Sequence, residues 1–242
     1  MKPSRLVLFD IDGTLLTTSR TAWEDPFKTA MEEALAETGE KRELDTTRYR
    51  PGGKTDTQII YEILDQNGIP EERIAQVLPR VRAKYLAFLG SMIGAHPDTV
   101  TLKPGVRELL DELHPHPEIL LGLLTGNFEE GARIKLKAQG LNGYFTFGAF
   151  GDNARVRSEL PQRAVDAAKH LKGHHYEGKQ IVIIGDTPND IHCGRHLGVR
   201  TIAVATSHYS VEDLTAENPD FVFPDLTDKE KVISAILDSL PK

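Results

Sequence analysis

Short apolar runs recur along the chain and alternate with longer stretches that have helical periodicity. The runs lie at residues 6–9, 119–124, 180–184, 201–205 and 221–223. A strand without polar/apolar alternation is typically buried on both faces, as strands are in a parallel sheet covered by helices. The pattern therefore predicts an α/β fold built on a parallel sheet.

The connecting helices are predicted from the spacing of apolar residues. They are expected at residues 104–113, 129–139, 159–171, 190–197 and 228–240. Pro104 is placed at the first position of its helix, where a missing N–H is tolerated, and Gly140 and Gly198 are placed directly after two others. These helices would cover the faces of the sheet.

One long segment interrupts the alternation. Residues 21–95 have helical periodicity throughout and contain no strand-like run. Three helical faces are expected in this segment, the third of them bent or restarted at Pro79. We therefore predict two domains: an α/β core at residues 1–18 and 98–242, and an inserted helical domain at residues 19–97.

Composition excludes several classes of protein. The 242 residues include 29 Lys and Arg against 36 Asp and Glu, a net charge of −7, without a basic block that would favour nucleic acid as a partner. No apolar stretch approaches the roughly 20 residues of a membrane helix. The single cysteine, Cys193, cannot form an internal disulfide, which favours a cytoplasmic protein. A monomer or a homodimer is expected.

Two pairs of carboxylates follow predicted strands. Asp10 and Asp12 come after the first strand, and Asp186 and Asp190 come after the strand at 180–184. Alone, the Asp12-Gly13 pair is also typical of a surface turn. Four carboxylates at one sheet edge would repel each other unless a cation binds there, and an all-oxygen ligand set favours Mg²⁺. The pairs therefore predict a magnesium site.

A small polar segment follows the strand at 119–124. Thr125, Gly126 and Asn127 offer a hydroxyl and backbone N–H groups that suit a phosphate oxygen. Taken alone, the segment could equally be an ordinary loop. Next to the acidic pairs, it is interpreted as a phosphate-binding segment.

Together these motifs resemble those of the haloacid dehalogenase superfamily, and within it the phosphoglycolate-phosphatase-like phosphatases. The segment from Asp10 to Thr14 matches the first motif, Thr125 the second, and the segment from Gly185 to Asp190 the fourth. The resemblance covers nearly the whole chain. It implies a Rossmann-like parallel sheet with an inserted α-helical cap, and an enzyme that acts on phosphoric monoesters.

The third motif of that superfamily usually supplies a lysine before a helix, and this chain departs from it. The spacing to the helix at 159–171 places Arg157 in the lysine position, with Arg155 as the second candidate. A guanidinium is always charged and can bridge a carboxylate and a phosphate. Arg157 is therefore predicted to take the role of the lysine.

The resemblance implies a mechanism. Asp10 would attack phosphorus and form an aspartyl-phosphate, and Asp12 would protonate the leaving group and then deprotonate water. Mg²⁺ would be held by Asp10, by the backbone carbonyl of Asp12 and by Asp186, with Asp190 orienting metal-bound water or Arg157. Since dehalogenases lack the second acid, its presence favours phosphoryl transfer, and the substrate would be a small phosphorylated metabolite such as phosphoglycolate or a sugar phosphate.

One loop of the predicted cap is a candidate for substrate selection. It runs from Arg50 to Asp56 and contains Gly53, which allows close approach of the backbone, and the cation Lys54. The alternative is a solvated loop in which Thr55 or Asp56 caps the following helix. Both interpretations stay open at the level of the sequence.

Two other functions fit the same fold. A sugar phosphomutase of the β-phosphoglucomutase type shares the acids of the first motif but returns the phosphoryl group to substrate. A catalytically inactive binding protein would keep the fold without turnover. The intact acidic positions favour the phosphatase over the binding protein.

Overall fold

A computed structural model describes residues 4–19, 26–47, 52–152 and 154–238. Six strands form one parallel sheet in the order β5-β4-β1-β6-β7-β8. Their bounds are Arg5–Phe9 for β1, Ile119–Leu124 for β4, Gly148–Ala149 for β5, Ile181–Gly185 for β6, Arg200–Val204 for β7 and Phe221–Phe223 for β8. The predicted α/β fold class is confirmed.

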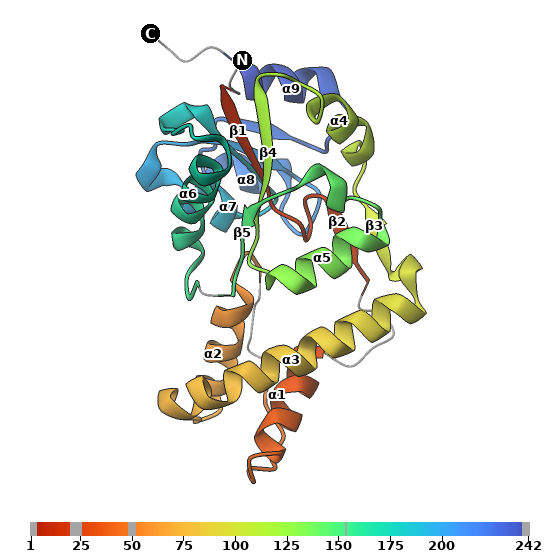
Figure 1. The fold of residues 1–242 in the computed structure, drawn as a ribbon, viewed down its shortest axis with the longest axis vertical. Helices are drawn as coiled ribbons and strands as arrows, with labels where there is room; N and C mark the ends of the chain where they lie inside the picture. The colour runs from red at the N-terminus through yellow and green to blue at the C-terminus, as the bar shows by residue number, and fades with distance from the viewer. Residues whose placement is uncertain (1–3, 20–25, 48–51, 153, 239–242) are drawn as a thin grey trace.

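The side chains of β1 alternate between two hydrophobic cores. Val7 and Phe9 are buried in a core shared with α4, α5 and α9, whereas Leu6 and Leu8 are buried in a second core shared with α6. The bounds are Val106–Leu113 for α4, Glu129–Ala138 for α5, Leu160–Lys172 for α6 and Lys229–Leu237 for α9. Figure 1 shows helices on both sides of the sheet. Because both faces are covered, the strand is apolar at consecutive positions.

Three short strands were not predicted. β5 has only two residues, and β2 (Leu16–Thr18) and β3 (Val100–Leu102) have three each. β2 and β3 pair with each other as an antiparallel ribbon outside the main sheet. Strands of two or three residues carry too few apolar positions for a recognisable pattern.

The predicted bounds of two helices were partly wrong. Pro104 is not the first residue of its helix, because Gly105 adopts φ 78° and α4 begins only at Val106. The helix expected at 190–197 consists of α7 (Pro188–Cys193) and a separate 3₁₀ turn, Arg195–Leu197, divided at Gly194. Thr187 and Asp190 form a capping box that starts α7 earlier than predicted. A further short helix, α8 (Val211–Ala216), was not predicted.

Three helices lie between β2 and β3 in the part of the chain that the structure describes. They are α1 (Pro26–Ala36), α2 (Asp56–Gln66) and α3 (Glu71–Ala95), and we call residues 19–97 the helical insert. Figure 1 shows α1, α2 and α3 beyond the end of the sheet that faces away from the chain termini. α3 continues through Pro79 and does not restart there. Its buried apolar face packs on α1, where the rings of Phe27 and Tyr85 stack at 3.9 Å, and this packing compensates for the missing hydrogen bond.

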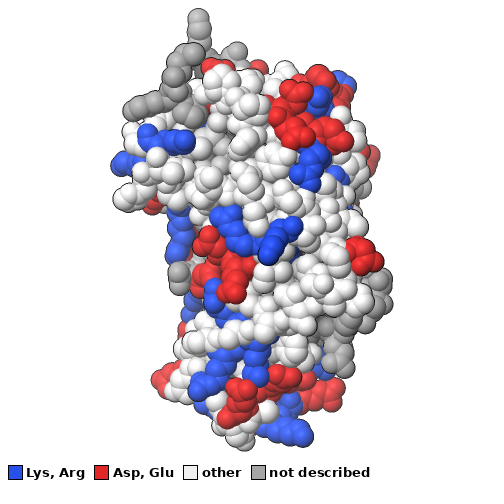
Figure 2. All heavy atoms as spheres, turned by 45° about the vertical axis from the view of Figure 1, so that its right-hand side comes forward, with Lys and Arg blue, Asp and Glu red and all other residues white. Residues whose placement is uncertain are grey.

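The surface carries interspersed charges. Figure 2 shows acidic and basic side chains side by side over the helical insert. Lys84 of α3, for example, pairs with Glu33 and Glu37 of α1 at 3.0 and 2.7 Å. Within the described ranges, no helix is long and apolar enough to cross a membrane.

The start of α4 generates a test of the fold. A Cβ at Gly105 would lie 2.2 Å from the backbone carbonyl carbon of Leu226, and its left-handed φ is unfavourable for other residues. Gly140 has a similar φ of 66°, but nothing lies within 4 Å of an added Cβ. We expect Gly140→Ala to lower the free energy of unfolding by about 1 kcal/mol and Gly105→Ala to lower it by about 1–3 kcal/mol more. Urea denaturation measures both, and equal losses would contradict the packing described at Gly105.

Candidate active site

Three buried carboxylates meet at the carboxyl ends of neighbouring strands. Asp10 follows β1 and Asp186 follows β6, the strand beside it, while Asp190 lies on α7, the helix after β6. One carboxylate oxygen of each residue lies within 4.8 Å of the others. A cluster of this kind could hold a metal ion through oxygen ligands alone.

Arg157 lies against this cluster. It precedes α6, and its Nη2 donates to Asp10 Oδ1 at 2.8 Å and also to Asp190 Oδ1. Three carboxylates and one guanidinium carry a formal charge of −2, which a divalent cation would neutralise. The structure thus brings Arg157 to the acids, whereas Arg155 lies apart, 2.5 Å from Glu71 and over the ring of Tyr61.

The electrostatics of the cluster are unfavourable without a further cation. Burial raises the pKa of Asp10 well above its usual range; the charge of Arg157 opposes this shift, and those of Asp190 and Asp186 add to it. Burial and the charge of Asp190 also raise the pKa of Asp186 to about 6. A bound metal ion would counter both burial and repulsion, because its positive charge stabilises the ionised carboxylates.

Neighbouring hydroxyls fix two of the carboxylates. Thr14 Oγ1 donates to Asp186 Oδ1 at 2.8 Å. Asp190 Oδ2 accepts from the backbone N and the Oγ1 of Thr187 at 3.0 and 2.6 Å. The acids are therefore held in place by the loops that follow β1 and β6.

Asp12 is not one of the three clustered carboxylates, and its side chain contacts Lys135 and Asn127 instead. Its Oδ2 accepts from Lys135 Nζ at 2.7 Å and from Asn127 Nδ2 at 2.8 Å. Asn127 Nδ2 also lies 2.7 Å from Thr125 Oγ1, so the predicted phosphate-binding segment is linked directly to the second aspartate. Gly126 lies between these two residues, in contact with the helical insert.

Lys135 was not predicted as a site residue. It lies on the buried face of α5 beside Ala132 and Leu136, although lysine is rarely buried without a partner. A cation within an apolar helical stripe is the signal that could have identified it. Periodicity alone assigned it to an ordinary helix face.

Part of the helical insert docks onto this sheet edge. Thr55 Oγ1 donates to the carbonyl of Ala154 at 2.7 Å, and the Asp56 backbone N donates to the carbonyl of Gly126 at 2.7 Å. The Asp56 carboxylate accepts from the backbone N of Phe128 at 2.8 Å, at the start of α5. Burial raises the pKa of Asp56 to about 7, against the opposing charge of Lys135.

The docked loop has features of both interpretations, the substrate-selecting loop and the solvated loop that caps the following helix. Thr55 does cap α2, accepting from Gln58 N at 3.0 Å, and both Thr55 and Asp56 are buried, whereas Gly52 is exposed and Gly53 and Lys54 are half-buried. A Cβ at Gly126 would lie 2.0 Å from the backbone oxygen of Lys54, so only glycine allows this approach. Arg50 and Pro51, which begin the predicted loop, lie outside the described residues.

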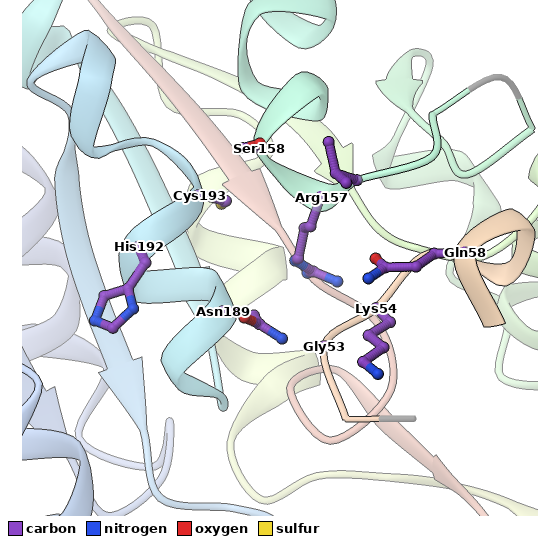
Figure 3. A pocket seen from close by; sticks show the side chains of 9 residues that line it. Gly53, Lys54, Gln58, Arg157, Ser158, Asn189, His192 and Cys193 are labelled. Atoms are coloured by element: carbon purple, nitrogen blue, oxygen red, sulfur yellow. The ribbon is translucent and has the colours of Figure 1, made fainter. Parts of the chain in front are cut away.

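A cavity of about 270 Å³ lies between the docked loop and Arg157. Figure 3 shows Lys54, Gln58, Asn189 and Arg157 around it, with His192 on the far side of α7. Gly53 also lines this cavity, while Lys54 Nζ lies 2.5 Å from Glu62 Oε2. The lining offers cationic and amide donors next to Asp10's partner, Arg157.

The chain is similar in sequence and fold to several known proteins. The chain is 25% identical over 240 residues to a pyrophosphatase PpaX from Oceanobacillus iheyensis, covering 97% of this chain and 98% of the relative. It is 26% identical over 244 residues to a phosphoglycolate phosphatase from Pseudomonas savastanoi pv. phaseolicola, covering 98% and 81%. The solved structure of CbbY from Rhodobacter sphaeroides in complex with phosphate has a similar fold, with a TM-score of 0.65, 19% identity and coverage of 93% and 95%.

A family model extends over most of the sequence. The model for haloacid dehalogenase-like hydrolases matches residues 4–198, which include β1 with Asp10, the helical insert, Arg157 and α7 with Asp190. This range holds every residue of the site described above. The chain therefore belongs to the haloacid dehalogenase-like hydrolases.

Proposed function

We propose that this enzyme is a Mg²⁺-dependent phosphomonoester hydrolase of a small phosphorylated metabolite, acting through an aspartyl-phosphate. The observation that carries the proposal is the Asp10 carboxylate, buried at the end of β1 with two carboxylates and the Arg157 guanidinium around it. The name of one relative, a phosphoglycolate phosphatase, supports phosphomonoester hydrolysis, and that of the other, a pyrophosphatase, supports hydrolytic phosphoryl transfer in general.

The donor set suits the proposed metal. Asp10, Asp186 and Asp190, with the backbone carbonyl of Asp12, would hold Mg²⁺, which prefers few protein carboxylates and retained water. When bound, Mg²⁺ neutralises negative charge on the transferring phosphoryl group. The formal charge of −2 on the buried cluster and the raised pKa values of Asp10 and Asp186 support a divalent cation at this position.

The protein residues then have separate tasks. An Asp10 oxygen forms a bond to phosphorus as the bond from phosphorus to the leaving oxygen breaks, and Asp12 gives a proton to that oxygen. In the second step Asp12 takes a proton from water, whose oxygen attacks phosphorus and releases Asp10 and phosphate. Thr125 Oγ1 accepts in its contacts with Asn127, so its hydroxyl proton can be donated to a phosphoryl oxygen, alongside Arg157.

We propose that the helical insert is a cap domain, residues 19–97, over a core of residues 1–18 and 98–242. The pairing of Thr18 with Val100 at the base of the insert supports these boundaries. The loop with Gly53 and Lys54 would meet the leaving group, because both residues line the cavity next to Arg157. The leaving group would be glycolate or a sugar.

The setting of the enzyme is part of the proposal. A single cysteine, Cys193, is buried, and burial raises the pKa of its thiol to about 12. Because one cysteine cannot form an internal disulfide, we propose a cytoplasmic protein. We propose a monomer or a homodimer that binds neither nucleic acid nor membrane.

A screen over phosphoglycolate, sugar phosphates, nucleoside monophosphates and pyrophosphate identifies the substrate. Hexose phosphate interconversion with little phosphate release would instead indicate a phosphomutase.

The first prediction concerns the nucleophile. Asp10→Asn should abolish phosphate release while the far-UV circular dichroism spectrum stays unchanged, because the amide is nearly isosteric but a poor nucleophile. Release of p-nitrophenol from p-nitrophenyl phosphate measures turnover. Asp65→Asn, at an exposed carboxylate on α2, is the matched control and should retain activity. Turnover close to wild type in the Asp10→Asn variant would refute the nucleophile assignment.

The second prediction concerns the metal. Chelation with EDTA should stop phosphate release, and Mg²⁺ at about 100 times its Kd should raise the melting temperature by about 5–10 °C. The shift should disappear in Asp186→Asn, which removes one carboxylate of the cluster. Sodium chloride at matched ionic strength controls for screening. Full activity after chelation, or an equal shift in Asp186→Asn, would contradict a metal site at these residues.

The third prediction concerns Lys54. Lys54→Ala should lower kcat/KM for the best substrate of the screen by about tenfold, as expected for a lost hydrogen bond to a charged group. With p-nitrophenyl phosphate, whose aryl group lacks such a partner, the change should be below about twofold. Lys172→Ala, at the exposed end of α6, is the control. Equal losses of kcat/KM on both substrates would show that the loop has only a structural role.

A further inference from the structure

Lys135 is a buried cation that the proposed mechanism does not use. Its side chain is 9% exposed, whereas that of its partner Asp12 is 41% exposed. Lys135 Nζ lies 2.7 Å from Asp12 Oδ2 and 2.6 Å from Asn127 Oδ1. Burying an ammonium group is costly unless its protons are bonded, so this arrangement ties Lys135 to the second aspartate rather than to solvent.

Asn127 completes the network. Its Oδ1 accepts from Lys135, while its Nδ2 donates to Asp12 Oδ2 at 2.8 Å and lies 2.7 Å from Thr125 Oγ1. The amide is thereby fixed in one orientation, since oxygen and nitrogen face different partners. Two donors converge on Asp12 Oδ2, which fixes the plane of the carboxylate and the direction of Oδ1.

We propose that Lys135 is a positioning residue for Asp12, holding its carboxylate where it can exchange protons with the leaving group and with water. The inference rests on the proposed phosphatase function. A partly exposed carboxylate in the turn after β1 would otherwise sample several rotamers, and small misplacements of a reacting group are expensive in rate.

The helix that carries Lys135 is itself held by the helical insert. Asp56, the first residue of α2, accepts from the backbone N of Phe128, which precedes α5. Gly126 accepts from the backbone N of Asp56, so the insert also contacts the segment that leads to Asn127. Docking of the insert therefore supports both partners of Asp12.

The test exploits the difference between leaving groups. An alkyl leaving group needs a proton from Asp12, whereas p-nitrophenolate needs little protonation. Lys135→Met should lower kcat/KM for the best alkyl phosphate of the screen by about 10- to 100-fold, but for p-nitrophenyl phosphate by less than about threefold. Lys137→Met, at an exposed lysine on the same helix, should leave both values unchanged.

A double-variant cycle shows whether Lys135 acts through Asp12. Asp12→Asn alone should show the same selective loss, and adding Lys135→Met to it should change kcat/KM for the alkyl phosphate by less than about twofold. Losses that multiply in the double variant would show that Lys135 acts elsewhere. Urea denaturation of the four proteins adds a readout without turnover, in which the two substitutions should also be non-additive.

Lys135→Arg guards against a folding defect. This variant keeps the positive charge and should retain more alkyl phosphatase activity than Lys135→Met, whereas equal loss in both would contradict the proposed role. An active wild type whose Lys135→Met variant loses both substrates equally would overturn this inference alone. A wild type that hydrolyses neither phosphate would overturn the proposed function and the inference with it.

Discussion

Carboxylates gathered at the carboxyl ends of adjacent parallel strands repel each other, and the arrangement of the site depends on how this repulsion is offset. Asp10 follows β1 and Asp186 follows β6, and the parallel pairing of these strands brings their ends to one edge. Arg157 offsets one of the buried charges, and a divalent cation would offset the rest. The loops after β1 and β6 hold the acids through hydroxyl and backbone donors, so the positions of the acids follow from the positions of these strands.

Much of this arrangement could be predicted from sequence because it follows from local patterns. Strands buried on both faces appear as apolar runs, and the acids appear directly after them, so their meeting at one edge follows from the topology. Arg157 could be placed by its spacing to α6. The left-handed conformation of Gly105 could not be predicted, because the backbone at Leu226 that leaves no room for a Cβ there is distant in sequence. β2 and β3 were missed because a three-residue strand has no period to detect.

The part of the site that sequence did not reveal is its connection to the helical insert. Thr55 and Asp56 bond to backbone groups of loops that follow β4 and β5, and nothing in their local sequence indicates those partners. Lys135 likewise has a role only because α5 places it opposite Asp12. In both cases the tertiary fold decides whether a polar residue is a surface group or a buried one. The insert, α5 and the second aspartate thus form one connected polar network.

The central claim is that Asp10 accepts a phosphoryl group, and chemical trapping tests it most directly. Wild-type protein is quenched during turnover of p-nitrophenyl phosphate and reduced with borohydride, which converts an aspartyl-phosphate to homoserine, and its peptides are examined by mass spectrometry. We expect homoserine at Asp10 only when substrate is present. Phosphate release without any reduction at Asp10, or with reduction at another carboxylate, would contradict the account.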